Sequence, residues 1–311
     1  MLFTFLWGAN FILAEIALDD MAAISFSVTR FALGAAAMLA VMYYKYYQKN
    51  NRSSDILPFF PRIKRNQWPR LLLVSVIGAT LAPWLGIVGL ELTHGARASL
   101  WLALGPAISA VFGFLFGTEK MGTYGYVGIF LAVFGTVVLA WDGLRPEQGY
   151  WMGDFILIIA LILTVIELHL IKPLAREYGS APIVALRTAI GCSLYLIIAS
   201  PSLIQVSWLS LGIWTWIAII AGGAIGVGVG QWIKVRALKK IGPTQVVLYG
   251  NLVPVAALLI AWLSIGKDPS ELELISAVFI IGGAIMIQVI DTKAGPRQIK
   301  LSSDSKYLEE H

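Results

Sequence analysis

The sequence predicts an all-α integral membrane protein of ten transmembrane helices, arranged as two inverted five-helix repeats with both termini in the cytoplasm. Composition is the first observation behind this prediction. Hydrophobic residues make up 58% of the 311 residues and charged residues only 13%, whereas a soluble domain carries roughly a quarter charged residues. The mean hydropathy of +0.77 points the same way. The composition therefore excludes a soluble globular protein.

Apolar runs of suitable length are the second observation. A helix needs about 20 mainly apolar residues to cross the hydrocarbon core of a bilayer. The runs predict ten spans, at 1–17, 22–42, 70–91, 96–117, 122–141, 153–171, 182–200, 210–235, 243–265 and 271–290. The first span is short for a full crossing, but it lacks the basic start and the cleavage site of a signal peptide. Because the linkers are short, we expect no soluble domain.

An internal repeat is the third observation. One constant offset aligns residues of the two halves: Leu90 with Leu238, Pro106 with Pro254, Gly135 with Gly283, Gly78 with Gly226 and Trp84 with Trp232. Five spans per half force the two halves into opposite orientations, which is typical of alternating-access transporters. We expect a first repeat at 1–145, a second at 150–290 and a cytoplasmic tail at 291–311.

The basic residues predict the orientation. Most of the 23 lysines and arginines lie between the second and third spans, in alternate loops after that, and on the tail, while acidic residues gather in the opposite loops. The positive-inside rule then places both termini in the cytoplasm of a multi-pass protein in the cell membrane. The lipid bilayer is therefore a partner. The net charge of +5 is explained by topology, and no nucleic-acid partner is expected.

Several motifs for other functions are absent or misleading. The three histidines, at 94, 169 and 311, and the single Cys192 lack the paired spacing of a metal site. The glycine run from Gly222 to Gly230 resembles a nucleotide-binding loop, but it lies inside a predicted span with no strand before it. Its glycines at 222, 226 and 230 instead predict close helix packing. We expect no cofactor, no metal and no enzyme activity.

Prolines and charged residues inside spans are the candidate functional positions. Pro83, Pro106 and Pro254 each remove a backbone hydrogen bond. They are either tolerated kinks or sources of free carbonyls along a pathway. Arg30 and Arg187 occupy equivalent positions in the two halves. They either hold the structure together, for example by bonding backbone carbonyls, or contact a substrate.

Glu167 occupies the sixth span where the first half has Asn10. A carboxylate in such a place suits a proton carrier or a cation ligand, although pairing with His169 or Lys172 is an alternative. Lys234 follows Gln231 by one helical turn, so the two share a face. Its equivalent in the first half is Gly86. It could bind a substrate carboxylate, pair with Glu167 or extend toward the cytoplasm.

Aromatic residues within spans form a further candidate set: Trp7, Trp84, Trp101, Trp232 and Tyr249. Trp84 aligns with Trp232, and Trp101 aligns with Tyr249. The rings either pack in the core or wall a cavity that holds an organic solute. Asn251 and Ser99 could supply hydrogen bonds.

Several stretches resemble the EamA branch of the drug/metabolite transporter superfamily. They are Trp7-Gly8-Ala9-Asn10-Phe11, Arg30, residues 90–99, Pro106 and Gly117-Thr118-Glu119, and in the second half residues 237–243, Pro254 and Gly266-Lys267-Asp268. The resemblance covers residues 1–290. It implies the ten-span inverted-repeat fold and a central cavity. It also implies that the cavity is lined by Trp7, Asn10, Trp84, Trp101, Glu167, Gln231, Lys234, Tyr249 and Asn251.

Members of this family commonly export amino acids, other metabolites or toxic organic compounds. The resemblance therefore implies a secondary transporter, an exporter of amino acids or related carboxylate metabolites. The alternative is an exporter of hydrophobic cations by proton antiport. Protons are the candidate coupling ion, and the protein is expected to be a monomer or a homodimer. Lys234 departs from the aromatic or apolar residue usual in the family late in span 8.

Overall fold

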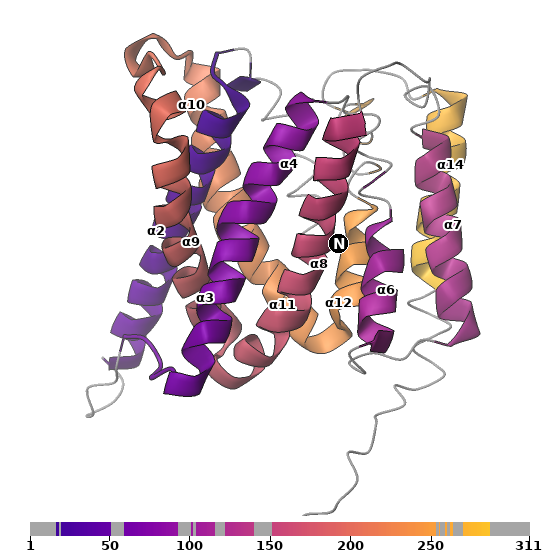
Figure 1. Cartoon of the computed structure of the whole chain (residues 1–311), viewed down its shortest axis with the longest axis horizontal. Helices are drawn as coiled ribbons and strands as arrows, with labels where there is room; N and C mark the ends of the chain where they lie inside the picture. The colour runs from indigo at the N-terminus through magenta and orange to yellow at the C-terminus, as the bar shows by residue number, and fades with distance from the viewer. Residues whose placement is uncertain are drawn as a thin grey trace, which may run out of the picture.

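The computed structural model describes residues 17–18, 20–50, 59–92, 101, 104–115, 122–139, 151–252, 255, 259, 262–263 and 270–286. Over these residues the regular structure is entirely helical. Figure 1 shows the helices standing side by side with their long axes roughly upright. Five of the described helices are long and apolar enough to cross a membrane by length and composition. An all-helical membrane protein is what the composition predicted.

The described elements follow one another along the chain. They are α2 (Ala23–Asn50), η1 (Arg65–Gln67), α3 (Trp68–Val76), η2 (Ile77–Leu81), α4 (Ala82–Glu91), α6 (Gly105–Leu115), α7 (Thr123–Leu139), α8 (Trp151–Tyr178), α9 (Ser180–Ile204), η4 (Trp208–Ser210), α10 (Ile213–Ile220), η5 (Ala221–Gly230), α11 (Gln231–Ile241), α12 (Pro243–Gly250) and α14 (Glu271–Ile285). Here η2 and η5 are π-helical, and η1 and η4 are 3₁₀-helical.

Most predicted spans fall on these helices. The long helices extend past the predicted limits, α2 to Asn50 and α8 to Tyr178, because polar residues can continue a helix after it leaves the apolar layer. Spans 96–117 and 243–265 are described in part. Span 1–17, with Trp7 and Asn10, lies almost wholly outside the described residues, and Pro254 also lies outside them.

Helices pack in pairs that correspond between the two halves. Contacts join α2 with α9, α6 with α12, and α7 with α14. The internal repeat aligns α2 with α9 and α7 with α14, while α6 and α12 lie in the equivalent predicted spans 96–117 and 243–265. The π-helical segments follow the same pattern, because α2 packs on η5 while α9 packs on η2.

Glycines allow the close approach of α2 and η5. A Cβ added to Gly223 would lie 2.9 Å from the carbonyl oxygen of Arg30, and one added to Gly228 would lie 3.2 Å from that of Gly34. These two glycines are five residues apart, not four as in the predicted stripe, because a π-helix bonds from i to i+5. The glycine run thus lies in a helix and packs against a neighbour, as the packing interpretation expected.

An apolar cluster joins six elements: α2, α3, α8, α9, α11 and α12. Among its fully buried members are Met38, Leu71, Leu168 and Leu238. At roughly 25 cal/mol per Å² of buried apolar surface, such side chains each contribute on the order of 1.5–3 kcal/mol. A second cluster joins α6, α7, α12 and α14.

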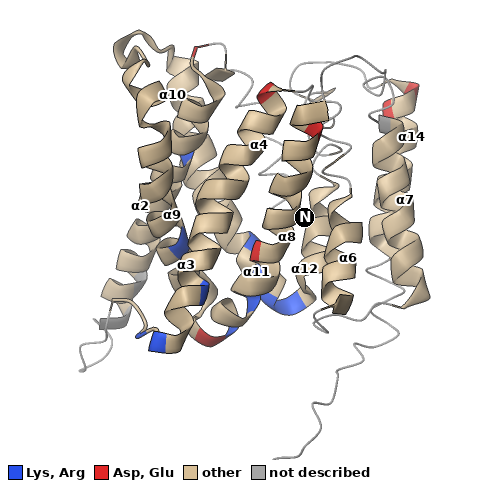
Figure 2. Cartoon of the chain, in the orientation of Figure 1, with Lys and Arg blue, Asp and Glu red and all other residues tan. Residues whose placement is uncertain are grey.

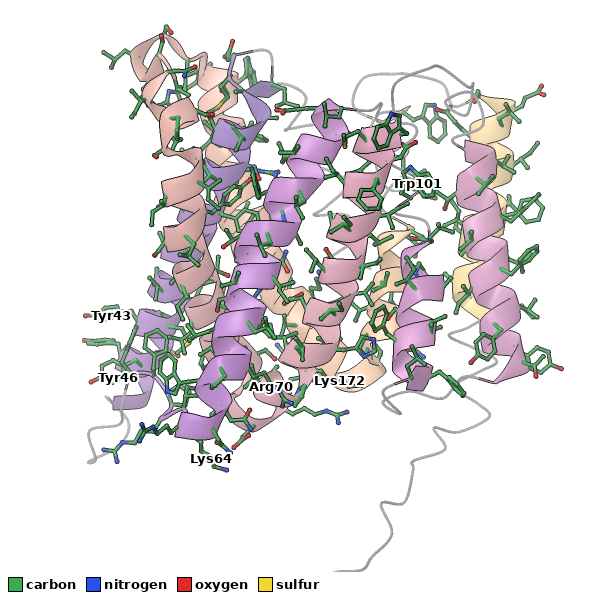
Figure 3. All side chains as sticks on the ribbon, viewed as in Figure 1. Tyr43, Tyr46, Lys64, Arg70, Trp101 and Lys172 are labelled. Carbon is green, nitrogen blue, oxygen red and sulfur yellow. The ribbon has the colours of Figure 1, made fainter. Side chains whose placement is uncertain are left out.

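Charges separate toward opposite ends of the bundle. Lysines and arginines gather at the lower end in Figure 2, and acidic residues mark the upper end. Lys64, Arg70 and Lys172 lie at this lower end in Figure 3. There, Lys64 Nζ lies 2.9 Å from Glu177 Oε1, and this carboxylate raises the pKa of Lys64. The basic and acidic segments that alternate along the sequence therefore lie mainly at opposite ends of the bundle.

Adjacent glycines in α14 provide a matched test of the packing against α7. A Cβ at Gly283 would collide with the Gly128 carbonyl and lie 2.8 Å from the backbone nitrogen of Ala132, whereas one at Gly282 meets no described atom within 4 Å. We therefore expect Gly283→Ala to destabilise the protein by about 1–3 kcal/mol through overpacking. Gly282→Ala should leave stability unchanged or slightly raised. Unfolding midpoints of the purified variants in detergent test this, and equal midpoints would contradict the packing.

Candidate functional site: a buried ion pair beside a broken helix

Two oppositely charged side chains meet inside the bundle. Glu167 lies on α8 and Arg187 on α9, and each is only 2% exposed. Arg187 Nε lies 3.2 Å from Glu167 Oε1. Both helices also contact η2 and α11. An ion pair in such a place is costly to desolvate, so it needs further polar partners to persist.

The third partner of the pair is a backbone carbonyl that its own helix leaves free. Arg187 Nη2 donates a hydrogen bond of 2.7 Å to the carbonyl oxygen of Gly78 in η2. In this π-helical turn the Ala82 N–H bonds the carbonyl of Ile77. The next residue is Pro83, which has no N–H to offer Gly78. The proline therefore frees a carbonyl, and an arginine from another helix satisfies it.

Glycine is required at position 78 for steric reasons. A Cβ there would lie 2.5 Å from Glu167 Cγ and 2.9 Å from Arg187 Nη2. Any side chain would thus displace the ion pair. The sequence signalled this residue only through its repeat, as Gly226, and gave no sign of its contact with the pair. Thr80 adds a second hydrogen bond between η2 and α9, since its hydroxyl donates to the carbonyl of Gly191 at 2.7 Å.

Several polar atoms at this site remain unpaired among the described residues. Arg187 Nε and Nη1 and Glu167 Oε1 have no hydrogen-bond partner there, although the pair is within ion-pair distance. Gln231 Oε1, on a side chain 6% exposed, also has none within the described part of the chain. A buried polar group without a partner costs about 1–3 kcal/mol. Arg187 Nη1 and Gln231 Oε1 are therefore available to a ligand, whereas Arg187 Nε and Glu167 Oε1 face each other in the ion pair.

Lys234 completes a group that we call the charged cluster: Glu167, Arg187 and Lys234. It lies on α11, one turn after Gln231, and is half-buried. It interacts electrostatically with both Glu167 and Arg187. The structure thus brings Lys234 together with Glu167, one of the alternatives that the sequence offered, and with Arg187. Gln231 begins α11, one turn before Lys234.

Arg30 has different surroundings from its repeat equivalent Arg187. Its guanidinium lies 4.5 Å from the ring centroid of Phe26, one turn earlier on α2. Its Nε has no hydrogen-bond partner within the described residues. The difference follows from the sequence, because the position equivalent to Glu167 is occupied by Asn10, which lies outside the described residues.

The described rings of the predicted aromatic set pack against different apolar clusters. Trp84 packs against a cluster that includes Val28 and Tyr195, Trp232 packs against the cluster of six elements, and Tyr249 packs near α6 and α14. Trp101 lies in the upper half of the bundle (Figure 3), and its indole N–H has no partner among the described residues. That these rings wall a cavity stays a prediction.

His169 takes part in a separate polar contact. Its Nε2 lies 3.4 Å from the hydroxyl oxygen of Ser109 on α6, which also accepts a hydrogen bond of 3.2 Å from Thr244. The carboxylate of Glu167, on the same helix as His169, pairs instead with Arg187 of α9. No spacing in the sequence links Ser109 and Thr244 to this histidine. Among the described residues, no group of three or more His, Cys, Asp or Glu is placed to hold a metal.

The remaining predicted positions have simple structural settings. Pro106 is buried in the first turn of α6, which begins at Gly105. A proline there removes no helical hydrogen bond, so the expected loss in mid-helix is wrong for this residue. Asn251 is buried directly after α12.

An all-helical bundle with long apolar helices and a buried charged cluster defines a multi-pass membrane protein. The chain belongs to the EamA-like transporter family, of the drug/metabolite transporter superfamily, whose sequence profile matches residues 1–141 and 151–289. The resemblance seen in the sequence is therefore confirmed, and so is the general role in transport at the cell membrane.

Individual relatives are distant but extensive. The chain is 23% identical over 292 residues to the "Uncharacterized transporter YyaM" of Bacillus subtilis, covering 91% of this chain and 90% of the relative. It is 25% identical over 240 residues to an "Uncharacterized transporter" of Methanothermobacter thermautotrophicus, covering 73% and 66%. One crystal structure matches with a TM-score of 0.74 at 19% identity, over 94% of this chain and 96% of the other. That match shows the fold alone.

The ion pair gives a testable stability prediction. Arg187→Met leaves the Glu167 carboxylate buried without its cation and the Gly78 carbonyl without its donor, so we expect a loss of about 3–5 kcal/mol. The double variant Glu167→Gln/Arg187→Met should recover part of this loss, since it leaves no uncompensated charge. Denaturant unfolding of the four members of this cycle measures the coupling between the two side chains.

A matched control comes from the exposed pair at the lower end. Lys64→Met breaks the contact with Glu177, and exposed pairs contribute only about 0–1 kcal/mol. If Arg187→Met proved no more destabilising than Lys64→Met, the Glu167–Arg187 pair would not be a major contributor to the stability of the bundle.

Proposed function

We propose that the chain is a secondary transporter that exports small organic solutes, chiefly amino acids or related carboxylate metabolites, by alternating access through a central cavity. The observation that carries the proposal is the charged cluster. Ionisable side chains inside a membrane bundle are rare and mark transport pathways. Here they lie beside unpaired polar atoms that a solute could engage.

The inverted arrangement of the two repeats is part of the proposal. It is supported by the correspondence of helix contacts between the halves, with α2 on η5 and α9 on η2. Inverted repeats place the solute site where the two halves meet. The charged cluster is consistent with such a site, since Glu167, Arg187 and Lys234 lie on the second half and Arg187 bonds the Gly78 carbonyl in η2 of the first.

The π-helical segments support a pathway that changes shape. π-Helical turns are frequent at functional sites, and both η2 and η5 interrupt long apolar helices next to this cluster. A glycine-rich segment such as η5 offers little side-chain resistance to bending or sliding on a neighbour. The lower, lysine-rich end of the bundle is proposed to face the cytoplasm.

Transport by the purified protein in proteoliposomes tests the proposal. Labelled amino acids and small carboxylates are offered with and without an imposed pH gradient. We expect at least one of them to move, Lys234→Ala to reduce its flux about tenfold or more, and Glu167→Gln to remove any acceleration by the gradient. Lys240→Ala, an exposed lysine on the same helix, is the matched control and should transport as wild type does.

Other outcomes separate the competing functions. Movement of a lipophilic cation in exchange for protons, with no movement of amino acids or carboxylates, would replace this proposal by cation export. Unchanged flux and unchanged pH dependence in both Lys234→Ala and Glu167→Gln would remove these residues from the pathway.

A further inference from the structure

The charges that meet inside the bundle do not balance locally. Glu167, Arg187 and Lys234 lie on membrane-spanning helices and interact with one another, one acid against two cations. An excess charge in an apolar layer calls for a counter-ion.

Within the charged cluster the surplus is on Lys234. Glu167 Oε1 lies 3.2 Å from Arg187 Nε, so the carboxylate is already committed to the arginine. Lys234 lies on α11, which packs against both α8 and α9, and it interacts electrostatically with both members of the pair. One carboxylate cannot neutralise two cations, so the cluster carries a formal net charge of +1.

The carboxylate of the cluster is enclosed. Glu167 and Arg187 are each 2% exposed, and η2 covers them so closely that a Cβ at Gly78 would lie 2.5 Å from Glu167 Cγ. Glu167 is therefore held between its own arginine and η2.

Hydrogen-bond donors are also left over. Arg187 Nη1 has no partner within the described part of the chain. A carboxylate can accept from two such donors at once, and charge-assisted hydrogen bonds of this kind are the strong ones. Lys234 supplies charge and Arg187 supplies a fixed N–H.

The repeat indicates that the lysine is not there for packing. Its equivalent in the first half is Gly86, where an added Cβ would meet no described atom within 4 Å. The same position of the fold is thus compatible with no side chain at all. A cation in one half alone makes the interior asymmetric in charge.

From this we propose that Lys234 and Arg187 form an anion-binding site that selects solutes of net charge −1, monocarboxylates in particular, over zwitterions and cations. This inference rests on the proposed function for its transport role, since it names the class of solute that the same site takes. Of the two solute classes in the proposed function, amino acids and carboxylate metabolites, this inference favours carboxylates that carry no ammonium group.

Three probes with one skeleton and different charges test the selectivity. They are 3-phenylpropionate, phenylalanine and 2-phenylethylamine, with net charges of −1, 0 and +1; propionate, alanine and ethylamine form a shorter series. Binding to the purified full-length protein in detergent is measured by ligand-induced shifts of the unfolding midpoint. We expect the carboxylate of at least one series to bind about tenfold or more tightly than its zwitterion and its amine.

Variants assign the preference to the cluster. Lys234→Met should weaken carboxylate binding about tenfold or more, Lys234→Arg should keep it within about threefold, and Lys240→Met should leave it unchanged. If Lys234→Met fails to fold, the order of the three probes on wild-type protein and the rescue by Lys234→Arg still decide the question.

Binding and transport can fail separately. A carboxylate that binds through Lys234 but does not cross proteoliposomes would uphold the anion site and reject the transport proposal. The anion site is overturned if no carboxylate binds, if the zwitterion or the amine binds as tightly, or if Lys234→Met binds the carboxylate as wild type does. Flux of phenylalanine in any of these cases would leave the transport proposal standing.

Discussion

The carbonyl oxygen of Gly78 imposes the constraint from which the rest of the site follows. In the apolar layer of a membrane every backbone polar group needs a partner, and Pro83 removes the donor that the helix would have supplied. Arg187 fills this gap from α9. A buried guanidinium needs an anion in turn, and Glu167 on α8 provides it. One missing N–H therefore ties together η2, α8 and α9.

The two repeats share one helical arrangement but differ in their buried charged residues. Arg30 and Arg187 are equivalent, yet within the described ranges only Arg187 has a carboxylate beside it. In the sequence, the first half carries Asn10 where the second carries Glu167. Lys234 adds to this difference, since its equivalent is Gly86. The two halves therefore share corresponding helices while they differ in these charges. The asymmetry affects the electrostatics of the interior, which is where selectivity for a solute arises.

Close packing and irregular helical segments coexist in this bundle. The cluster of six elements buries leucine and methionine side chains fully, and the glycine contacts of α7 with α14 leave no room for a methyl group. By contrast, η2 and η5 are π-helical segments within long helices. Rigid pairs joined through irregular turns are the arrangement in which one group of helices can move against another.

The sequence by itself determined the membrane class, the family, the positions of most spans and the identity of Glu167, Gln231 and Lys234 as unusual residues. Composition and hydrophobic length suffice for these, because they reflect the cost of placing polar groups in an apolar layer. Only the tertiary structure decided which partners meet: Arg187 with Glu167 and Gly78, and His169 with Ser109. It also placed Pro106 at the start of a helix. Such contacts depend on the rotation and spacing of helices distant in the chain, and local periodicity carries no information about either.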